Sequence, residues 1–130
     1  MKERVRQFWA AFARGDLEGG LALLSDDIVF TIAGTTPFSG VIAGKDALRA
    51  HLQRFGALLE PGAQMHVREL IAEGDVVVCL SEGTMRGKTG RDYNKEYAGV
   101  FRFADGQIVS VTMFLDTALI ETALCGKTIQ

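Results

Sequence analysis

The fold is decided by residues 82–116, which read Glu82-Gly-Thr-Met-Arg-Gly-Lys-Thr-Gly-Arg-Asp-Tyr-Asn-Lys-Glu-Tyr-Ala-Gly-Val-Phe-Arg-Phe-Ala-Asp-Gly-Gln-Ile-Val-Ser-Val-Thr-Met-Phe-Leu-Asp116. The segment contains the end of one strand, a polar turn and then two strand-like runs. Ala104-Asp-Gly-Gln107 separates the two runs, and its Asp-Gly pair supplies the positive φ angles that a tight turn requires. These features predict a long antiparallel hairpin.

Further strands precede this hairpin along the chain. The pattern of β-branched and aromatic residues predicts strands over 65–72, 76–86, 95–103 and 107–115. They are joined by turns at 73–75, 87–94 and 105–106, so the last three strands follow one another through hairpins.

The first half of the chain has helical spacing. Val5, Phe8, Trp9 and Phe12 recur at intervals of three and four residues, which predicts an amphipathic helix over 2–14. Asp16 is placed to cap a second short helix. A strand is predicted over 28–32, a loop over 33–44, a third helix over 45–59 and a C-terminal helix over 117–124.

This order of elements predicts an α+β fold in a single domain that covers residues 1–130. Helices followed by hairpin-connected strands place the helices on one face of a curved antiparallel sheet. A chain of 130 residues has the length of one ordinary domain.

Composition and charge exclude several classes of function. The net charge of -2 gives no basic surface for nucleic acid, and the apolar runs are too short to cross a membrane. The N-terminus has no signal-peptide pattern, so the cytoplasm is the expected compartment. Cys79 and Cys125 have neither disulfide-framework nor metal-ligand spacing and are expected to be small hydrophobic residues.

The hairpin segment, together with two shorter motifs, resembles a known family. The motifs are Gly40-Val-Ile-Ala-Gly-Lys-Asp-Ala-Leu-Arg-Ala-His-Leu52 and Ala72-Glu-Gly-Asp-Val-Val-Val78. From Trp9 to about Leu124 the chain resembles the SnoaL-like branch of the nuclear transport factor 2-like superfamily. The resemblance implies a cone-shaped, curved, mixed or antiparallel sheet wrapped around the N-terminal helices, with an apolar pocket inside that binds a small hydrophobic molecule.

The resemblance does not select one activity, because the superfamily includes isomerases, polyketide cyclases, epoxide hydrolases and non-catalytic binding domains. Two hypotheses follow. In the first, the protein is an enzyme that performs acid/base chemistry on a small hydrophobic molecule without a cofactor or a metal. In the second, it is a non-catalytic ligand-binding or interaction domain that uses the same cavity.

Glu82 is the first candidate catalytic residue. It shares one strand face with Val78, Leu80 and Thr84, and burial on that face would raise its pKa and make it a general acid or base. The alternative is that Glu82 lies solvated at the strand end, or that it pairs with Arg86 or Lys88. Because both faces of this strand are largely apolar, the outer face of the sheet is also expected to form a homodimer.

Tyr97 is the second candidate catalytic residue. In ketosteroid isomerases, which belong to the same superfamily, a tyrosine and a protonated carboxylic acid stabilise an oxyanion. The resemblance implies this role for Tyr97 with Glu82. The alternative is a structural hydrogen bond, and no acidic residue in the loop over 33–40 takes the place of the isomerase's general base.

Epoxide hydrolysis of the limonene type is disfavoured by the residues at the matching positions. Glu82 takes the place of that family's aspartate, but Leu80 takes the place of its arginine and Met113 that of its second carboxylate. Asp116 precedes a helical pattern and is expected to cap that helix rather than to act in catalysis.

The residues expected to line the pocket are apolar, with one exception, and come from both halves of the chain: Trp9, Phe12, Phe30, Leu52, Phe55, Val78, Leu80, Thr84, Phe101, Met113 and Leu115. His51 lies on the apolar side of the third predicted helix as a core or pocket residue. His51 and His66 lack neighbours at metal-ligand spacing, so no metal site is expected.

Overall fold

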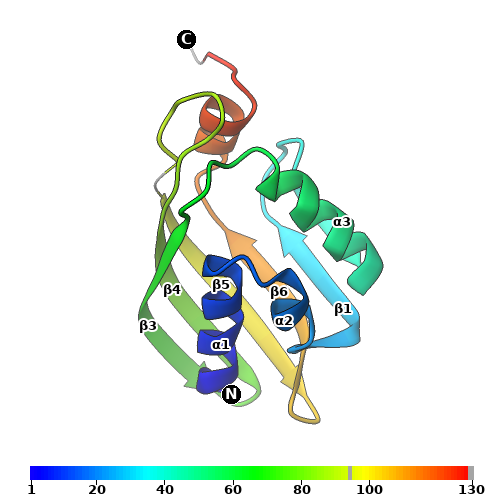
Figure 1. Ribbon diagram of the computed structural model, residues 1–130. Coiled ribbons are helices and arrows are strands. Elements are labelled where there is room, and N and C mark those ends of the chain that lie inside the picture. The colour runs from blue at the N-terminus through cyan, green and yellow to red at the C-terminus, as the bar shows by residue number, and fades with distance from the viewer. Residues whose placement is uncertain (94, 129–130) are drawn as a thin grey trace.

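The residues that the structure describes form four α-helices, one π-helical turn and a six-stranded sheet (Figure 1). The structure is a computed structural model that describes residues 1–93 and 95–128. Asn94, the last residue of the predicted polar turn, lies outside the described residues, as do residues 129–130. The elements are α1 (Lys2–Ala13), α2 (Leu17–Leu21), β1 (Leu24–Ile32), β2 (Gly40–Ala43), α3 (Lys45–Gly56), β3 (Gln64–Glu73), β4 (Val76–Thr84), β5 (Lys95–Ala104), β6 (Gln107–Phe114), α4 (Thr117–Leu119) and the π-helix η1 (Ile120–Leu124).

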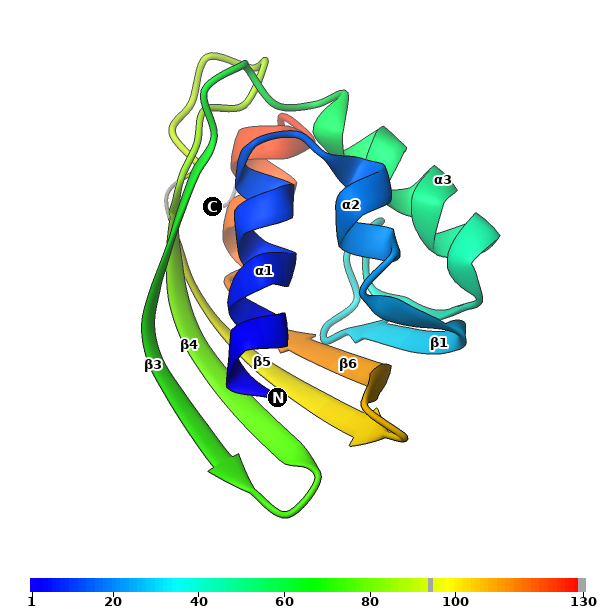
Figure 2. The ribbon, with the colours of Figure 1, turned by 60° about the horizontal axis from the view of Figure 1, so that its bottom comes forward.

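The strands are arranged in the order β2-β1-β6-β5-β4-β3, and β1 and β6 are parallel whereas all other neighbours are antiparallel. Figure 2 shows the sheet curving around α1, α2 and α3, which lie on its concave side. The predicted fold class is therefore confirmed: the domain is α+β, with a curved mixed sheet that encloses the helices.

The hairpin of β5 and β6 closes as predicted. Asp105 and Gly106 have φ angles of 51° and 77°, so both central residues of the β5–β6 turn adopt the left-handed conformation that Asp-Gly favours. The short turn fixes the register of β5 against β6, in which Phe101 lies opposite Val111.

Several element bounds differ from the prediction: β1 begins at Leu24 instead of residue 28, and α3 ends at Gly56 instead of residue 59. β2 forms within the predicted loop, because Val41 and Ile42 pair with Thr31 and Phe30 of β1. The C-terminal helix is only partly α-helical, since one short α-helical turn continues into η1. Asp116 caps it as predicted: its Oδ1 accepts the Leu119 N–H at 3.0 Å.

α1 packs a stripe of aromatic side chains onto the concave face of the sheet. Val5, Phe8 and Trp9 are buried, and the ring of Phe8 meets that of Phe101 edge to face at a centroid separation of 5.8 Å. Met113 from β6 belongs to the same core cluster. Phe12 and the α3 residues Leu52 and Phe55 are half-buried at its edge.

The predicted orientation of β4 is wrong. Val77, Cys79, Ser81 and Gly83 face the helices, whereas Val78, Leu80, Glu82 and Thr84 lie on the convex face. Both faces of β4 carry mainly apolar side chains. The alternation of side chains along the strand therefore assigns its residues to two faces, but it does not show which face packs against the helices.

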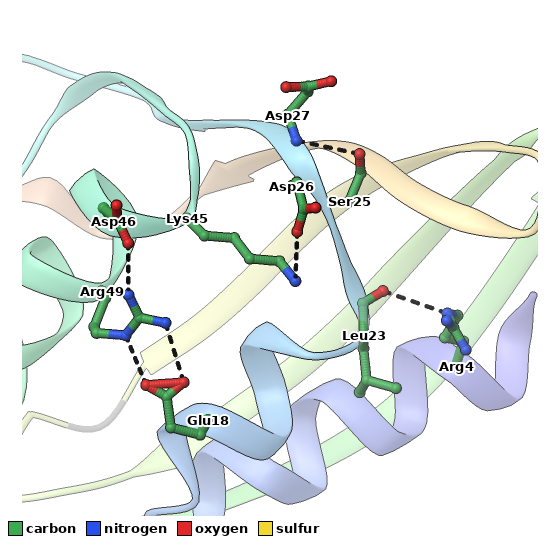
Figure 3. A network of polar contacts seen from close by, with 9 residues as sticks. All are labelled: Arg4, Glu18, Leu23, Ser25, Asp26, Asp27, Lys45, Asp46 and Arg49. Atoms are coloured by element: carbon green, nitrogen blue, oxygen red, sulfur yellow. Dashed lines mark hydrogen bonds and ion pairs between the residues drawn. The ribbon is translucent and has the colours of Figure 1, made fainter.

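Ion pairs hold α3 against α2 and β1 (Figure 3). The guanidinium of Arg49 donates to both carboxylate oxygens of Glu18, at 2.6 and 3.1 Å, and to Asp46 Oδ1 at 2.8 Å. Lys45 Nζ lies 3.3 Å from Asp26 Oδ1. The Arg49 guanidinium lowers the pKa of the Glu18 carboxyl. Each exposed ion pair stabilises the fold only slightly, but the bidentate geometry of the Arg49–Glu18 pair fixes the orientation of α3 relative to α2.

Both cysteines are free, as expected: Cys79 is buried in β4 and Cys125 is half-buried after η1. Within the described residues, no helix is both long enough and apolar enough to cross a membrane.

The contact between Gly87 and η1 gives a first prediction. A Cβ at Gly87 would lie 2.3 Å from the carbonyl oxygen of Ala123, a backbone atom that cannot move aside without shifting the helix. Gly87→Ala is therefore expected to lower the free energy of unfolding by about 1–3 kcal/mol in urea titrations.

Gly56 provides the matched control. It ends α3 without a positive φ angle, and a Cβ there would meet no atom within 4 Å. Gly56→Ala is expected to raise the free energy of unfolding by about 0.5 kcal/mol, because it restricts the unfolded chain. Equal effects of the two substitutions would contradict the close approach at Gly87.

Candidate functional site

An apolar cavity lies between α1, α3, η1 and the concave face of the sheet. Its volume, measured as the space open to the centre of a water molecule, is about 60 Å³. The side chains around it are almost all aromatic or aliphatic: Phe8, Trp9, Phe12, Phe30, Ile32, Phe38, His51, Leu52, Phe55, Tyr97, Met113, Leu115 and Ile120. The helices and the sheet meet around a space that side chains do not fill, and this space is the candidate functional site.

The cavity has two titratable side chains among the described residues that line it, His51 and Tyr97. His51 is 6% exposed, and its ring meets that of Phe38 edge to face at 5.6 Å. Its Nε2 is buried and has no hydrogen-bond partner among the described residues. Burial, with a smaller contribution from the Arg54 guanidinium, lowers the pKa of His51 below its ordinary value.

Phe38 is held in the cavity wall by a compact turn. The Phe38 N–H donates to Thr36 Oγ1 at 3.2 Å, the Ser39 N–H donates to the Thr36 carbonyl at 3.0 Å, and the Ser39 hydroxyl donates to the Ala33 carbonyl at 3.1 Å. These bonds satisfy the polar groups of the loop and direct an aromatic ring inward.

Tyr97 reaches the cavity from β5. Its ring lies 5.8 Å from that of Trp9, and the residue is 8% exposed. Burial raises the pKa of the Tyr97 phenol above its ordinary value. Tyr97 is therefore a protonated hydrogen-bonding group at neutral pH and a poor base.

Lys95 lies just behind this part of the wall. Its Nζ is 3.8 Å from the centroid of the Tyr93 ring and 5.0 Å from that of Tyr97, and it has no hydrogen-bond partner among the described residues. Burial lowers the pKa of Lys95 to about 7, while the charge of Asp116 opposes this shift. The amine therefore loses its proton more readily than an exposed lysine does.

Glu82 lies outside the cavity. It projects from the convex face of β4, where it is directly opposite Glu96, and Arg68 Nη1 lies 3.9 Å from Glu82 and 2.8 Å from Glu96. Tyr97 is opposite Ser81 on the concave face, so the predicted pairing of Tyr97 with Glu82 is wrong. The alternative of a solvated, ion-paired Glu82 is correct, although Arg68 is the partner instead of Arg86 or Lys88.

Most of the residues predicted to line the pocket do so. Those in the wall are Trp9, Phe12, Phe30, Leu52, Phe55, Met113 and Leu115, together with the candidate catalytic residue Tyr97. Phe101 is fully buried in the core against Phe8 and is not part of the cavity wall. Val78, Leu80 and Thr84 are on the convex face and were wrongly placed because the inner face of β4 was misassigned.

The predicted pocket residues did not include Phe8, Ile32, Phe38 or Ile120, and the prediction did not commit to His51. Phe38 follows Pro37 in a predicted loop, where a buried aromatic side chain has no periodic signal. Ile120 begins the π-helical turn, which displaces the apolar face expected for a regular helix. His51 was recognised on the apolar side of its helix, but the sequence shows no second polar group that would distinguish a pocket residue from a core residue.

A groove of about 480 Å³ lies outside the cavity, between the α1–α2 turn and the segment that follows α3. Phe12 and Leu52 belong to the linings of both the groove and the cavity. The two spaces therefore adjoin each other at these side chains.

Within the described residues, no group of three or more His, Cys, Asp or Glu side chains is placed to hold a metal ion. The chemical properties of the cavity are therefore those of His51, Tyr97 and the surrounding apolar wall.

Comparisons with known proteins agree with this architecture. The family model described as the SnoaL-like domain matches residues 5–111. A nuclear transport factor 2-like protein of unknown function from Burkholderia pseudomallei is 25% identical, with 95% of each chain covered and a TM-score of 0.86. A second such protein, from Burkholderia xenovorans, is 27% identical over 94% of this chain and 93% of that chain, with a TM-score of 0.74.

A putative isomerase from Bacillus subtilis has a TM-score of 0.85 at 20% identity, with 98% of this chain and 94% of that chain covered, which shows the shared fold. No curated protein sequence matches the chain.

The buried amine of Lys95 gives a prediction for the pH dependence of stability. Between pH 7 and its ordinary pKa of 10.5, the unfolded chain holds a proton on Lys95 that the folded protein has released. Raising the pH from 6 to 8.5 is therefore expected to increase the contribution of Lys95 to the free energy of unfolding. In Lys95→Met this contribution is absent, and the variant should be more stable than the natural protein at pH 6, as measured by urea titration.

Lys88→Met is the control, because Lys88 is an exposed lysine in the turn that precedes β5. It should leave the pH dependence of stability unchanged. An identical pH dependence in Lys95→Met and in the natural protein would show that the Lys95 amine is not desolvated.

Proposed function

The chain belongs to the SnoaL-like domain family, and we propose that it binds a compact, flat, largely apolar molecule in the cavity between α1, α3 and the sheet. The observation that supports this proposal is the composition of the cavity wall, which is aromatic and aliphatic except for His51 and the phenol of Tyr97. An apolar wall stabilises a bound ligand whose apolar surface is removed from water, and a few polar groups orient such a ligand.

The size and shape of the cavity support a small ligand. A volume of about 60 Å³ admits a compact group before any side chain moves. Phe12 and Leu52 are half-buried and adjoin the outer groove, so their rotation would join the two spaces and admit a molecule the size of one or two aromatic rings. Edge-to-face contacts with Trp9 and Phe38 favour a flat ligand.

If the protein is an enzyme, its chemistry depends on His51 and Tyr97, whereas Glu82 is on the opposite face of the sheet. Isomerase, cyclase or hydrolase chemistry would use Tyr97 as a hydrogen-bond donor to a developing negative charge. The second candidate function is non-catalytic binding. It is favoured by the absence, among the described lining residues, of a carboxylate that could serve as a general base.

We also propose that two copies of the chain associate through the convex face of the sheet. A row of aliphatic and threonine side chains crosses the six strands through directly paired residues, namely Val41, Thr31, Thr112, Val100, Val78 and Ile71. Val41 and Ile71 are 71% and 50% exposed, and Phe114 beside the row is 50% exposed. A second copy would cover this face.

Charged residues on either side of the row favour a second copy as the occupant. Arg102 lies on one side, and Glu82 and Glu96 lie on the other. An antiparallel arrangement of two identical faces places Arg102 of each copy near the glutamates of the other. An apolar centre with a polar rim is the usual composition of such an interface.

The two free thiols, Cys79 and Cys125, support a reducing compartment such as the cytoplasm as the site of action.

Ligand binding is testable through Trp9, the single tryptophan of the chain, because it lines the cavity. Titration with naphthalene is expected to change the fluorescence of Trp9 and to saturate. Leu115→Phe adds volume to the cavity wall and should weaken binding by about tenfold or more, because the ligand then has less space.

Leu119→Phe is the matched control, since Leu119 is half-buried at the end of α4 and does not line the cavity. It should leave the naphthalene affinity unchanged. Equal weakening by both variants, or no saturable change in fluorescence, would contradict binding in this cavity.

The dimer is testable by sedimentation at micromolar concentration. The natural protein is expected to sediment as two chains, and Val100→Lys as one chain of 14.1 kDa, because a charge at the centre of an apolar interface is costly to desolvate. Gln53→Lys introduces the same charge on the exposed side of α3 and should remain dimeric. A monomeric natural protein would refute the proposed interface.

A further inference from the structure

Two half-buried side chains lie where three neighbouring spaces in the protein meet. Phe12 on α1 and Leu52 on α3 line the cavity, the outer groove and a smaller space between α1, α2 and α3. Among the described residues that line the cavity, these are the two that also line the groove. A molecule that moves from the groove into the cavity therefore passes between α1 and α3 at Phe12 and Leu52.

The packing of Phe12 differs from that of the deeper cavity wall. Its ring lies 5.9 Å from that of Trp9 and 6.5 Å from that of Phe55, so it bridges α1 and α3. Phe12 and Leu52 are half-buried, whereas Phe8 and Trp9 are buried in the core. A change of rotamer at the two half-buried side chains costs less packing than one in the buried wall.

The two ends of α3 are held by backbone hydrogen bonds. Before the helix, the Gly44 N–H donates to the Ile28 carbonyl at 2.8 Å. Beyond its other end, the Lys88 N–H donates to the Leu58 carbonyl, also at 2.8 Å. These bonds fix the ends of α3 to β1 and to the turn between β4 and β5, so a displacement of α3 is largest between them.

Between these ends, α3 is joined to α2 by an ion pair of side chains. The Arg49 guanidinium donates to both carboxylate oxygens of Glu18 (Figure 3). Arg49 and Leu52 are three residues apart and so are neighbours on the surface of α3. Glu18 follows Leu17, which lines the groove. The ion pair thus lies beside the place where the groove adjoins the cavity.

The Arg49–Glu18 pair is strong in geometry but open to water. Its two side chains are 32% and 67% exposed, so both charges remain hydrated when the pair breaks. A bidentate pair holds two helices in one orientation, while an exposed pair breaks at little cost and is weakened by salt. This combination suits a contact that opens and closes.

We propose that ligands enter the cavity from the groove between Phe12 and Leu52, and that the Arg49–Glu18 ion pair keeps this entrance closed by holding α3 against α2. This inference rests on the proposed ligand-binding function and adds the route of the ligand and its control. Because the ion pair lies outside the cavity, it stabilises the closed form equally with and without ligand. It therefore sets the rates of entry and release and leaves the affinity unchanged.

The first experiment measures these rates by stopped flow, from the Trp9 fluorescence during naphthalene binding. In Arg49→Met the association and dissociation rate constants are both expected to rise about threefold, the effect of losing one exposed ion pair from the closed form, while Kd is unchanged. Glu18→Gln should have the same effect, and the double variant should add nothing further. Sodium chloride should speed exchange in the natural protein and not in Arg49→Met.

Arg86→Met is the matched control for this experiment. It removes an exposed ion pair of the same kind, in which Arg86 Nη1 lies 3.7 Å from Asp92 Oδ1 in the turn before β5. Its rate constants should equal those of the natural protein. The melting temperatures of Arg49→Met and Arg86→Met, compared with each other, show whether a general loss of stability explains faster exchange.

The second experiment tests the entrance itself. Phe12→Leu shortens a side chain at the entrance and is expected to raise the association rate constant about threefold, because a smaller side chain rotates aside at less cost. Ile32→Val also removes volume from the cavity wall, but Ile32 lies on β1 and does not line the groove. It should leave the association rate constant unchanged.

The outcomes separate this inference from the proposed function. Equal rate constants in Arg49→Met and Arg86→Met would overturn the role of the ion pair, and equal effects of Phe12→Leu and Ile32→Val would overturn the entrance. In both cases saturable binding of naphthalene would still support the cavity as a binding site. If naphthalene does not bind, the proposed function and the inference are both contradicted.

Discussion

The structure depends on the packing of the aromatic stripe of α1 against a sheet that curves around it. Phe8 and Trp9 meet Phe101 at ring centroid separations of 5.8 and 6.4 Å, and Trp9 also reaches Tyr97. Gly99 permits this approach, since a Cβ there would lie 2.9 Å from the Phe101 ring and 3.0 Å from Met113 Sδ. The sheet bends toward α1, and α3 meets β1 at the other edge. The space between the two contacts is the cavity.

The sequence was sufficient to predict the elements on which this packing depends. The spacing of Val5, Phe8 and Trp9 identified α1, and Asp105-Gly106 identified the hairpin, because both signals are local. β2 was missed because four residues on an edge strand, Gly40–Ala43, carry little pattern. Its formation depends on pairing with β1, which is a tertiary interaction. The end of α3 was predicted too late, since Leu59 leaves the helix to pair with Gly87.

The candidate site was predicted less well for a specific reason. β4 and β5 are joined by a long turn whose length does not fix their register, so the position of Tyr97 in β5 did not determine which face of β4 is inside. Ser81 proved to be opposite Tyr97, and Glu82 opposite Glu96. A difference of one residue in register thus decides whether the Glu82 carboxylate lies inside the cavity or on the convex face. In the structure it lies on the convex face, where Arg68 pairs with it.

This difference changes the chemistry that the fold can support. A buried carboxylate would have made the cavity a site for proton transfer. The described lining instead contains two side chains with polar groups, His51 and Tyr97, in a wall that is otherwise aromatic and aliphatic. Burial lowers the pKa of His51 and raises the pKa of Tyr97, so both side chains favour their uncharged forms. Without a carboxylate in the described lining, the cavity favours the burial of apolar surface over proton transfer.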